Sequence, residues 1–214
     1  APYEPCTHFY EALQCMWFVQ FCFKLVNDPT LTGRLDNYLY PYYKKDLEEG
    51  VLTKEFAFEL IEQLFYKHNE IYNTWPASIM VGGLDRDGNT VCNDLTYMCV
   101  KAISTTKLVN PSVAVCYTPD MKEDLLDLCV ESVANGFTKP SIFNDRVVRE
   151  GLEAAGVSKR DARYYVHSTC VEITPISCVN IEVATPYINL IKAFEYILGG
   201  KKEMYGDICR VGND

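Results

Sequence analysis

The chain has 214 residues, of which 48% are hydrophobic and 23% are charged, and its formal net charge is −9. These values are typical of a globular chain that is long enough to bury a core, and they exclude wholesale disorder. The acidic balance excludes a nucleic-acid footprint, which needs clustered Lys and Arg. Glu11, Gln14 and Gln20 interrupt the longest apolar run, so no membrane span is expected.

Capping residues and apolar residues at helical spacing predict four helices. Thr7 and Thr53 mark the beginnings of two of them, Thr118-Pro119 marks a third, and Asn144 or Asp145 opens the fourth. The predicted helices cover about residues 7–26, 53–71, 118–135 and 144–156. Each is expected to bury one apolar face.

Strand-like runs lie between these helices, at residues 78–81, 112–115 and 164–166. After the first run comes the turn-rich stretch Gly82–Asn89, where Asp85 and Asp87 are expected to form turns; polarising a substrate is the alternative role. Ser158 and Asp161 are typical of a short capping box. Helices that alternate with single strands indicate an α/β barrel or a layered sheet. Three strands are too few to close a barrel.

The ten cysteines and three histidines match no zinc-ligand spacing, so no metal site is expected. The first residues, Ala-Pro-Tyr-Glu-Pro, have neither the basic segment nor the cleavage site of a signal peptide. We therefore expect reduced thiols in a cytoplasm, with most cysteines acting as small core residues. A chain that begins without Met is compatible with processing or with an internal fragment.

The segment from His167 to Pro175 contains a thiol and a carboxylate two residues apart. If this segment is extended, Cys170 and Glu172 point to the same side. Cysteine supplies one-electron or nucleophilic chemistry, and glutamate supplies proton transfer. Spacing alone favours a simpler interpretation, a buried cysteine beside a solvated glutamate.

Several segments together resemble the glycyl radical enzymes, the family of pyruvate formate-lyase, the diol dehydratases and choline trimethylamine-lyase. Gly33–Tyr43 resembles the family signature G-R-x-D-Q-Y-x-Y-P-Y-Y, and Val81–Gly83 with Asn93–Tyr97 resembles G-G-Q…N-x-L-S-Y. Asn110–Val113 and Gly136–Asp145 follow in the family's order. Cys170-Val-Glu172 then occupies the place of the family's Cys-Val-Glu loop.

The resemblance implies an α/β fold in which residues 1–214 form part of the family's ten-stranded barrel. The helices would lie outside, and the cysteine would lie on a central finger loop. The family stores its radical on a glycine in a C-terminal R-V-x-G-[YFW] segment. In Arg210-Val-Gly-Asn the glycine comes one place early and no aromatic residue follows. We therefore expect an incomplete barrel domain, with the N-terminal part and the radical domain on absent segments.

By the same resemblance, Cys170 would be the thiyl-radical cysteine and Glu172 the general base. The implied reaction is radical cleavage of a C–O, C–N or C–C bond, of the dehydratase, amine-lyase or decarboxylase type. Thr169 and Val171 flank the single cysteine, whereas pyruvate formate-lyase has two adjacent cysteines, so thiolytic acyl transfer is disfavoured. No organic cofactor or metal would be bound.

The resemblance also suggests substrate-binding residues. Tyr187 falls where choline-lyase-like members have a pocket tyrosine, with a half-buried strand aromatic as the alternative. Thr169 replaces the family's usual glycine, and Asp28-Pro29 replaces the His-Ser pair that binds substrate hydroxyls in diol dehydratases. His167 is placed to hydrogen-bond near the thiol, with a solvated or core histidine as the alternative.

The family's partners would follow from its radical. An activating enzyme that uses S-adenosylmethionine and an iron–sulfur cluster would install the radical, and the substrate would be a small polar metabolite. The full-length parent would be a homodimer in the cytoplasm of an anaerobic organism, without nucleic-acid or membrane partners.

Two alternatives from other classes stay open. The chain would be an inert truncated fragment or a binding relic if no radical reaches Cys170. It would be a two-electron transferase or hydrolase if His167 activated Cys170 as a nucleophile. Residues three apart in an extended segment point to opposite sides, which argues against the second alternative unless the loop turns.

Overall fold

The computed structural model describes residues 3–25, 31–71, 77–168, 171–176, 178, 191, 194 and 198. By internal contacts the chain divides into a unit at Ala1–Ile181 and a second unit at Glu182–Asp214. In the second unit the described residues Ile191, Phe194 and Leu198 are helical and exposed. Within the described ranges, no helix combines the length and the apolar character needed to cross a bilayer.

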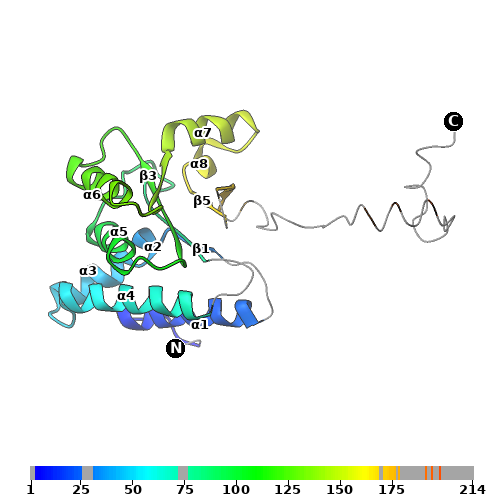
Figure 1. Ribbon diagram of the computed structural model, residues 1–214. Helices are drawn as coiled ribbons and strands as arrows, with labels where there is room; N and C mark the ends of the chain where they lie inside the picture. The colour runs from blue at the N-terminus through cyan, green and yellow to red at the C-terminus, as the bar shows by residue number, and fades with distance from the viewer. Residues whose placement is uncertain are drawn as a thin grey trace. The chain divides into compact units, whose positions relative to one another are not determined.

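The described part of the first unit alternates helices with short strands (Figure 1). Its helices are α1 Phe9–Leu25, α2 Leu35–Tyr38, α3 Tyr40–Glu48, α4 Lys54–Glu70, α5 Asp94–Thr106, α6 Glu123–Ala134, α7 Asp145–Ala154 and α8 Lys159–Ala162. Its strands are β1 Leu31–Gly33, β2 Ser78–Gly82, β3 Ser112–Tyr117, β4 Ser141–Asn144, β5 Tyr165–His167 and β6 Ile173–Pro175.

Strands β1 to β4 form a parallel sheet in chain order. Parallel neighbours need crossover connections, and these are right-handed in nearly all proteins. When every crossover moves to the next strand in the same direction, the helices gather on one face. The strand order and the crossover connections therefore explain why the helices lie on one side of the sheet, as they do in the wall of an α/β barrel.

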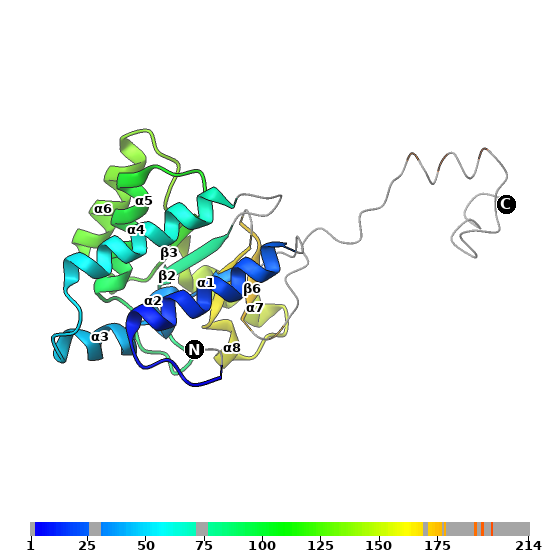
Figure 2. The ribbon, with the colours of Figure 1, turned by 90° about the horizontal axis from the view of Figure 1, so that it is seen from below.

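The two faces of this sheet have different coverings. The helix face carries Ile79, Val81, Val113 and Val115, which are fully buried in one apolar cluster with side chains of α1 to α6. In Figure 2, α1 and α4 lie side by side in front of the sheet, and the Trp17 and His68 rings contact each other edge to face, with their centroids 5.1 Å apart. The opposite face, here called the inner face, is covered by β5 and β6.

Several predicted helix boundaries are confirmed by capping hydrogen bonds. The Thr53 hydroxyl accepts from the Phe56 amide at 3.2 Å, and the Asn144 side chain accepts from the Val147 amide at 3.3 Å. Ser158 caps α8 and also donates to the Asp161 carboxylate at 2.7 Å. These caps satisfy amides that have no partner inside the helix.

Two predicted helix starts are wrong. Helix α6 begins at Glu123, because Thr118 instead opens a turn in which its carbonyl accepts from the Met121 amide at 3.0 Å. Helix α1 begins at Phe9, and Thr7 donates its amide and hydroxyl to Glu11 at 2.9 Å instead of accepting. The Glu11 carboxylate therefore does the capping.

Helix α5 is the largest element that the sequence patterns missed. Asn93 accepts from the Leu95 and Thr96 amides, and the Thr96 hydroxyl accepts from the Asn93 amide, which completes a capping box. The usual Glu or Gln at the third helical position is a Thr here, and this concealed the box. Helices α2 and α3 and strands β1, β4 and β6 were also not predicted.

Candidate active site

Strands β5 and β6 form an antiparallel hairpin, here called the finger hairpin, that contains the predicted cysteine segment. Tyr165 pairs with Pro175, Val166 with Thr174 and His167 with Ile173. Beyond these pairs the Ser168 amide donates to the Glu172 carbonyl at 2.6 Å. The chain therefore reverses between these two residues, and Cys170 is the middle residue of the connection. Thr169 and Cys170 themselves lie outside the described residues.

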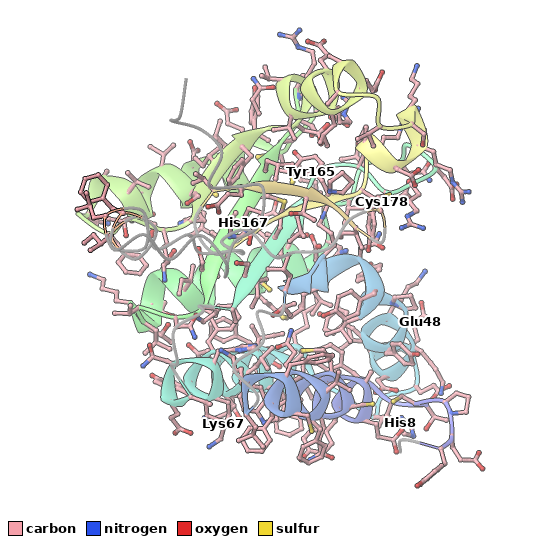
Figure 3. The ribbon with its side chains drawn as sticks, turned by 90° about the vertical axis from the view of Figure 1, so that its right-hand side faces the viewer. His8, Glu48, Lys67, Tyr165, His167 and Cys178 are labelled. Carbon is pink, nitrogen blue, oxygen red and sulfur yellow. The ribbon has the colours of Figure 1, made fainter. Side chains whose placement is uncertain are left out.

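The finger hairpin lies on the inner face of the parallel sheet. Tyr165 and Val166 share an apolar cluster with Met80, Ala114 and Cys116. Figure 3 labels Tyr165 and His167 on β5, and the His167 ring lies 5.7 Å from that of Phe143 on β4. In a closed α/β barrel this face of the strands is the inner one, and the hairpin lies against it in the four-stranded sheet described here.

Glu172 stands where β6 begins, and its side chain is exposed. Its Oε2 accepts a hydrogen bond from the Val171 amide at 3.1 Å. The segment expected to be extended includes Cys170, which lies outside the described residues, so that expectation stays a prediction. The described end of the segment, Glu172, lies at the turn end of the finger hairpin.

His167 is fully buried, so it is a core histidine in the structure. Its Nε2 lies 3.3 Å from the Ser112 hydroxyl oxygen on β3. Burial lowers the pKa of His167 to about 4, so the ring is neutral at pH 7. A ring with so low a pKa is a weak base toward a thiol, and this disfavours the two-electron alternative. The contacts of His167 fasten the finger hairpin to the sheet.

Three further predicted substrate-binding residues cannot be placed. Asp28, Thr169 and Tyr187 lie outside the described residues. Their roles stay predictions, as does that of Cys170.

Arg34 and Asp36 link the segments that the sequence showed only as separate motifs. The Asp36 carboxylate accepts from the Gly82 amide at 2.8 Å and from the Thr96 hydroxyl at 2.7 Å. The Arg34 guanidinium donates to the Gly82 carbonyl and, at 3.3 Å, to the Leu84 carbonyl. Both side chains are fully buried, and burial raises the pKa of Asp36. Both residues belong to the Gly33–Tyr43 signature, but the sequence did not indicate that they link β2 and α5.

Gly83 is required by the same network. A Cβ atom at this position would lie 2.7 Å from the Cys116 Cβ and 3.0 Å from the Arg34 Nη2, and the glycine has φ +74°. Only glycine tolerates both the close approach and the left-handed backbone. The network ties α2 to the end of β2 and to the first turn of α5.

A cavity of about 240 Å³ adjoins the flank of the finger hairpin. It is lined by Leu31, Thr32, Gly33, Arg34, Tyr38, Tyr164, Val166, Thr174, Pro175 and Ile176. The cavity shows that these side chains leave space between β1 and the hairpin.

Fold and site together define an α/β barrel protein with a cysteine hairpin against its inner wall. The family model described as pyruvate formate lyase-like matches residues 1–209. Isethionate sulfite-lyase of Oleidesulfovibrio alaskensis is 31% identical over 226 residues, covering 96% of this chain and 27% of the relative. Trans-4-hydroxy-L-proline dehydratase of Clostridioides difficile is 30% identical, covering 89% of this chain and 26% of the relative.

A solved glycyl radical enzyme from Archaeoglobus fulgidus has the same fold, with a TM-score of 0.78 and 31% identity. The match covers 91% of this chain and 27% of that structure. The chain belongs to the pyruvate formate lyase-like family of glycyl radical enzymes, and it spans about a quarter of the length of these relatives. The α/β barrel expectation is confirmed by this match.

Proposed function

We propose that this chain supplies the thiyl and proton-accepting groups of a glycyl radical lyase or dehydratase acting on a small polar metabolite. One observation carries the proposal: the strands on either side of the Cys170-Val-Glu172 segment, Tyr165–His167 and Ile173–Pro175, pair as a hairpin that lies on the inner face of the sheet. A reacting cysteine at the end of such a hairpin meets substrate inside a barrel, away from bulk water.

The proposed reaction conserves its electron count. A thiyl at Cys170 removes a hydrogen atom from a substrate carbon, which forms an S–H bond and leaves the unpaired electron on that carbon. Glu172 takes the proton of a hydroxyl on the same carbon, and a neighbouring bond breaks with its electron pair on the leaving group. The product radical then recovers the hydrogen atom from Cys170, so no oxidant is consumed.

The relatives indicate which leaving groups to test. One relative is named for release of sulfite from isethionate and another for dehydration of hydroxyproline. We therefore extend the candidate bonds from C–O, C–N and C–C to C–S. Substrate candidates carry the leaving group next to a carbon that bears a hydroxyl, as in isethionate, or the ring nitrogen, as in hydroxyproline.

The radical itself requires a source. We place the radical-bearing glycine outside these 214 residues, because Arg210-Val-Gly-Asn departs from the family's R-V-x-G-[YFW] pattern. The proposed partner is an activating enzyme that uses S-adenosylmethionine and an iron–sulfur cluster. The proposed whole protein is a cytoplasmic homodimer of an anaerobic organism.

The deciding experiment is anaerobic electron paramagnetic resonance on the full gene product with its activating enzyme, followed by a substrate screen. Cys170→Ala is expected to keep the glycyl radical signal and to lose all turnover. Glu172→Gln is expected to lose about 10²- to 10⁴-fold in rate, the usual worth of a general base. Cys178→Ala, a change at an exposed cysteine, is the matched control. Turnover by the Cys170→Ala protein would refute the proposal.

A further inference from the structure

The loop Gly83–Val91 is fixed by its own hydrogen bonds. The Asp85 carboxylate accepts from the Asp87 amide at 2.9 Å and from the Asn89 amide at 2.8 Å. The Val91 amide closes the loop by donating to the Gly83 carbonyl at 2.8 Å. Asp85 is therefore a turn former, as the sequence predicted, and the loop is a preformed platform.

Arg86 projects from this platform to the base of the finger hairpin. Its Nη2 donates to the Ile176 carbonyl at 3.1 Å, and its Cζ lies 5.2 Å from the centroid of the Tyr164 ring. The Ile176 amide in turn donates to the Tyr164 carbonyl at 2.9 Å. One guanidinium therefore contacts both chain segments where the hairpin begins and ends.

Tyr164 has two further contacts that hold it in place. The Arg34 Cζ lies 5.6 Å from the same ring centroid, so the Tyr164 ring makes cation–π contacts with two guanidinium groups. The Tyr164 hydroxyl donates to the Asn37 Oδ1 at 3.2 Å. The base of the hairpin is thus tied to the Arg34 network described above.

The platform also meets the residue that precedes Tyr164. A Cβ atom at Gly88 would lie 3.1 Å from the Arg163 Nη1, and Gly88 has φ +95°. A side chain there would displace the Arg163 guanidinium. Two separate positions of the loop therefore contact the segment that leads into β5.

We propose that Arg86 is a positioning residue that sets where the end of the finger hairpin lies. The hairpin has three paired residues in each strand, so a shift at its base carries through to its turn. His167 and Ser112 hold the hairpin near that turn, and Arg86 with Tyr164 holds its base. The contacts of Arg86 with Ile176 and Tyr164 are here called the clamp. The effect of the clamp on the position of Cys170 rests on the proposed function, whereas the clamp itself does not.

Hydrogen exchange read by mass spectrometry on the 214-residue chain tests the clamp. Arg86→Met is expected to speed exchange of the amides of residues 164–176 about tenfold, while β2 and β3 keep their wild-type rates. Arg86→Lys, which keeps a cation beside Tyr164, is expected to recover part of the protection. Arg146→Met is the control, because Arg146 is exposed and pairs only with Glu150 among the described residues.

Alkylation of Cys170, followed peptide by peptide, supplies a second readout. Its rate is expected to change several-fold in Arg86→Met relative to that of Cys22, which is exposed on α1. Wild-type exchange and alkylation in Arg86→Met would overturn the proposal. So would equal loss of protection in β2 and β3, which would make Arg86 a general stabiliser.

Arg86→Gln gives the same test if the Met variant does not fold. Neither result depends on radical chemistry. Failure of the clamp would therefore leave the paramagnetic resonance test of Cys170 untouched, and failure of that test would leave the clamp standing.

Discussion

The two faces of the parallel sheet are built from the same strands but serve different purposes. On the helix face, Ile79, Val81, Val113 and Val115 form a continuous apolar layer. On the inner face the strands begin with Ser78 and Ser112, and small or sulfur-bearing side chains follow toward the finger hairpin. Alternation along each strand separates the two sets.

Polar atoms are buried without a described hydrogen-bond partner on both sides of the sheet, and on the helix side they include both ring nitrogens of His68. Among the described residues, the Ser78 and Ser168 hydroxyls and the His167 Nδ1 are buried without a hydrogen-bond partner. A buried polar atom left in this state costs about 1–3 kcal/mol.

The largest expected effect comes from the helix face. Ile79→Ala is expected to lower the free energy of unfolding by about 2–5 kcal/mol, because a fully buried side chain leaves a cavity. Denaturant unfolding measures the change, with Ile79→Val, which removes a single methylene, as the milder control at about 0.5–1.5 kcal/mol. Equal, small losses in both variants would mean that this face is not the main core.

The two buried histidines, one on each side of the sheet, predict acid sensitivity. Burial lowers the pKa of His68 to about 3 and that of His167 to about 4. Both side chains are neutral in the folded chain, whereas in the unfolded chain they take up protons below about pH 6.5. Stability is therefore full above that pH and falls as the pH drops toward 4, by about 1.4 kcal/mol per pH unit for each histidine.

His68→Phe tests this comparison, since the ring contact with Trp17 can persist without a titrating group. Unfolding free energies at pH 7 and pH 5 are expected to differ less in this variant than in the wild type. His167→Phe should also reduce the difference, but it loses the Ser112 contact as well. An unchanged acid slope in both variants would show that the folded chain protonates these rings.

The smallest expected changes in stability come from replacing two neighbouring serines of the inner face, and the two changes should have opposite signs. Ser112→Ala removes the partner of His167 and is expected to destabilise the chain by about 1–2 kcal/mol. Ser78→Ala removes a hydroxyl without a described partner and is expected to stabilise it by up to about 1 kcal/mol. The two residues pair in register, so each controls for the other. Loss of stability in both variants would contradict the contrast between a partnered and an unpartnered hydroxyl.

The sequence predicted those parts of the fold that have local causes. Thr53, Asn144 and Ser158 cap helices through bonds to residues within three positions, so their patterns were sufficient. Helix α5 was missed although its box is equally local, because a Thr replaces the usual glutamate. The start of α6 was misplaced because Thr118-Pro119 suits a turn as well as a helix start.

The candidate site divides in the same way. Residue types and their order were enough to indicate Cys170 and Glu172 as a thiol and carboxylate pair and to suggest the family. The role of Arg34 and Asp36 depends on Gly82 and Thr96, which are far apart in the sequence, so no local pattern revealed it. His167 was expected near the thiol, and its burial against Phe143 and Ser112 emerged only from packing.

The sequence by itself indicated a candidate thiol and carboxylate, Cys170 and Glu172, and the alternation that makes one strand face apolar. The tertiary structure decided which segment lies against the other strand face. A strand pattern fixes which side chains share a face, but not which segment covers that face. Here the finger hairpin covers it, held by Arg86 at its base and by His167 near its turn, because contacts between distant segments become definite only when the chain is folded.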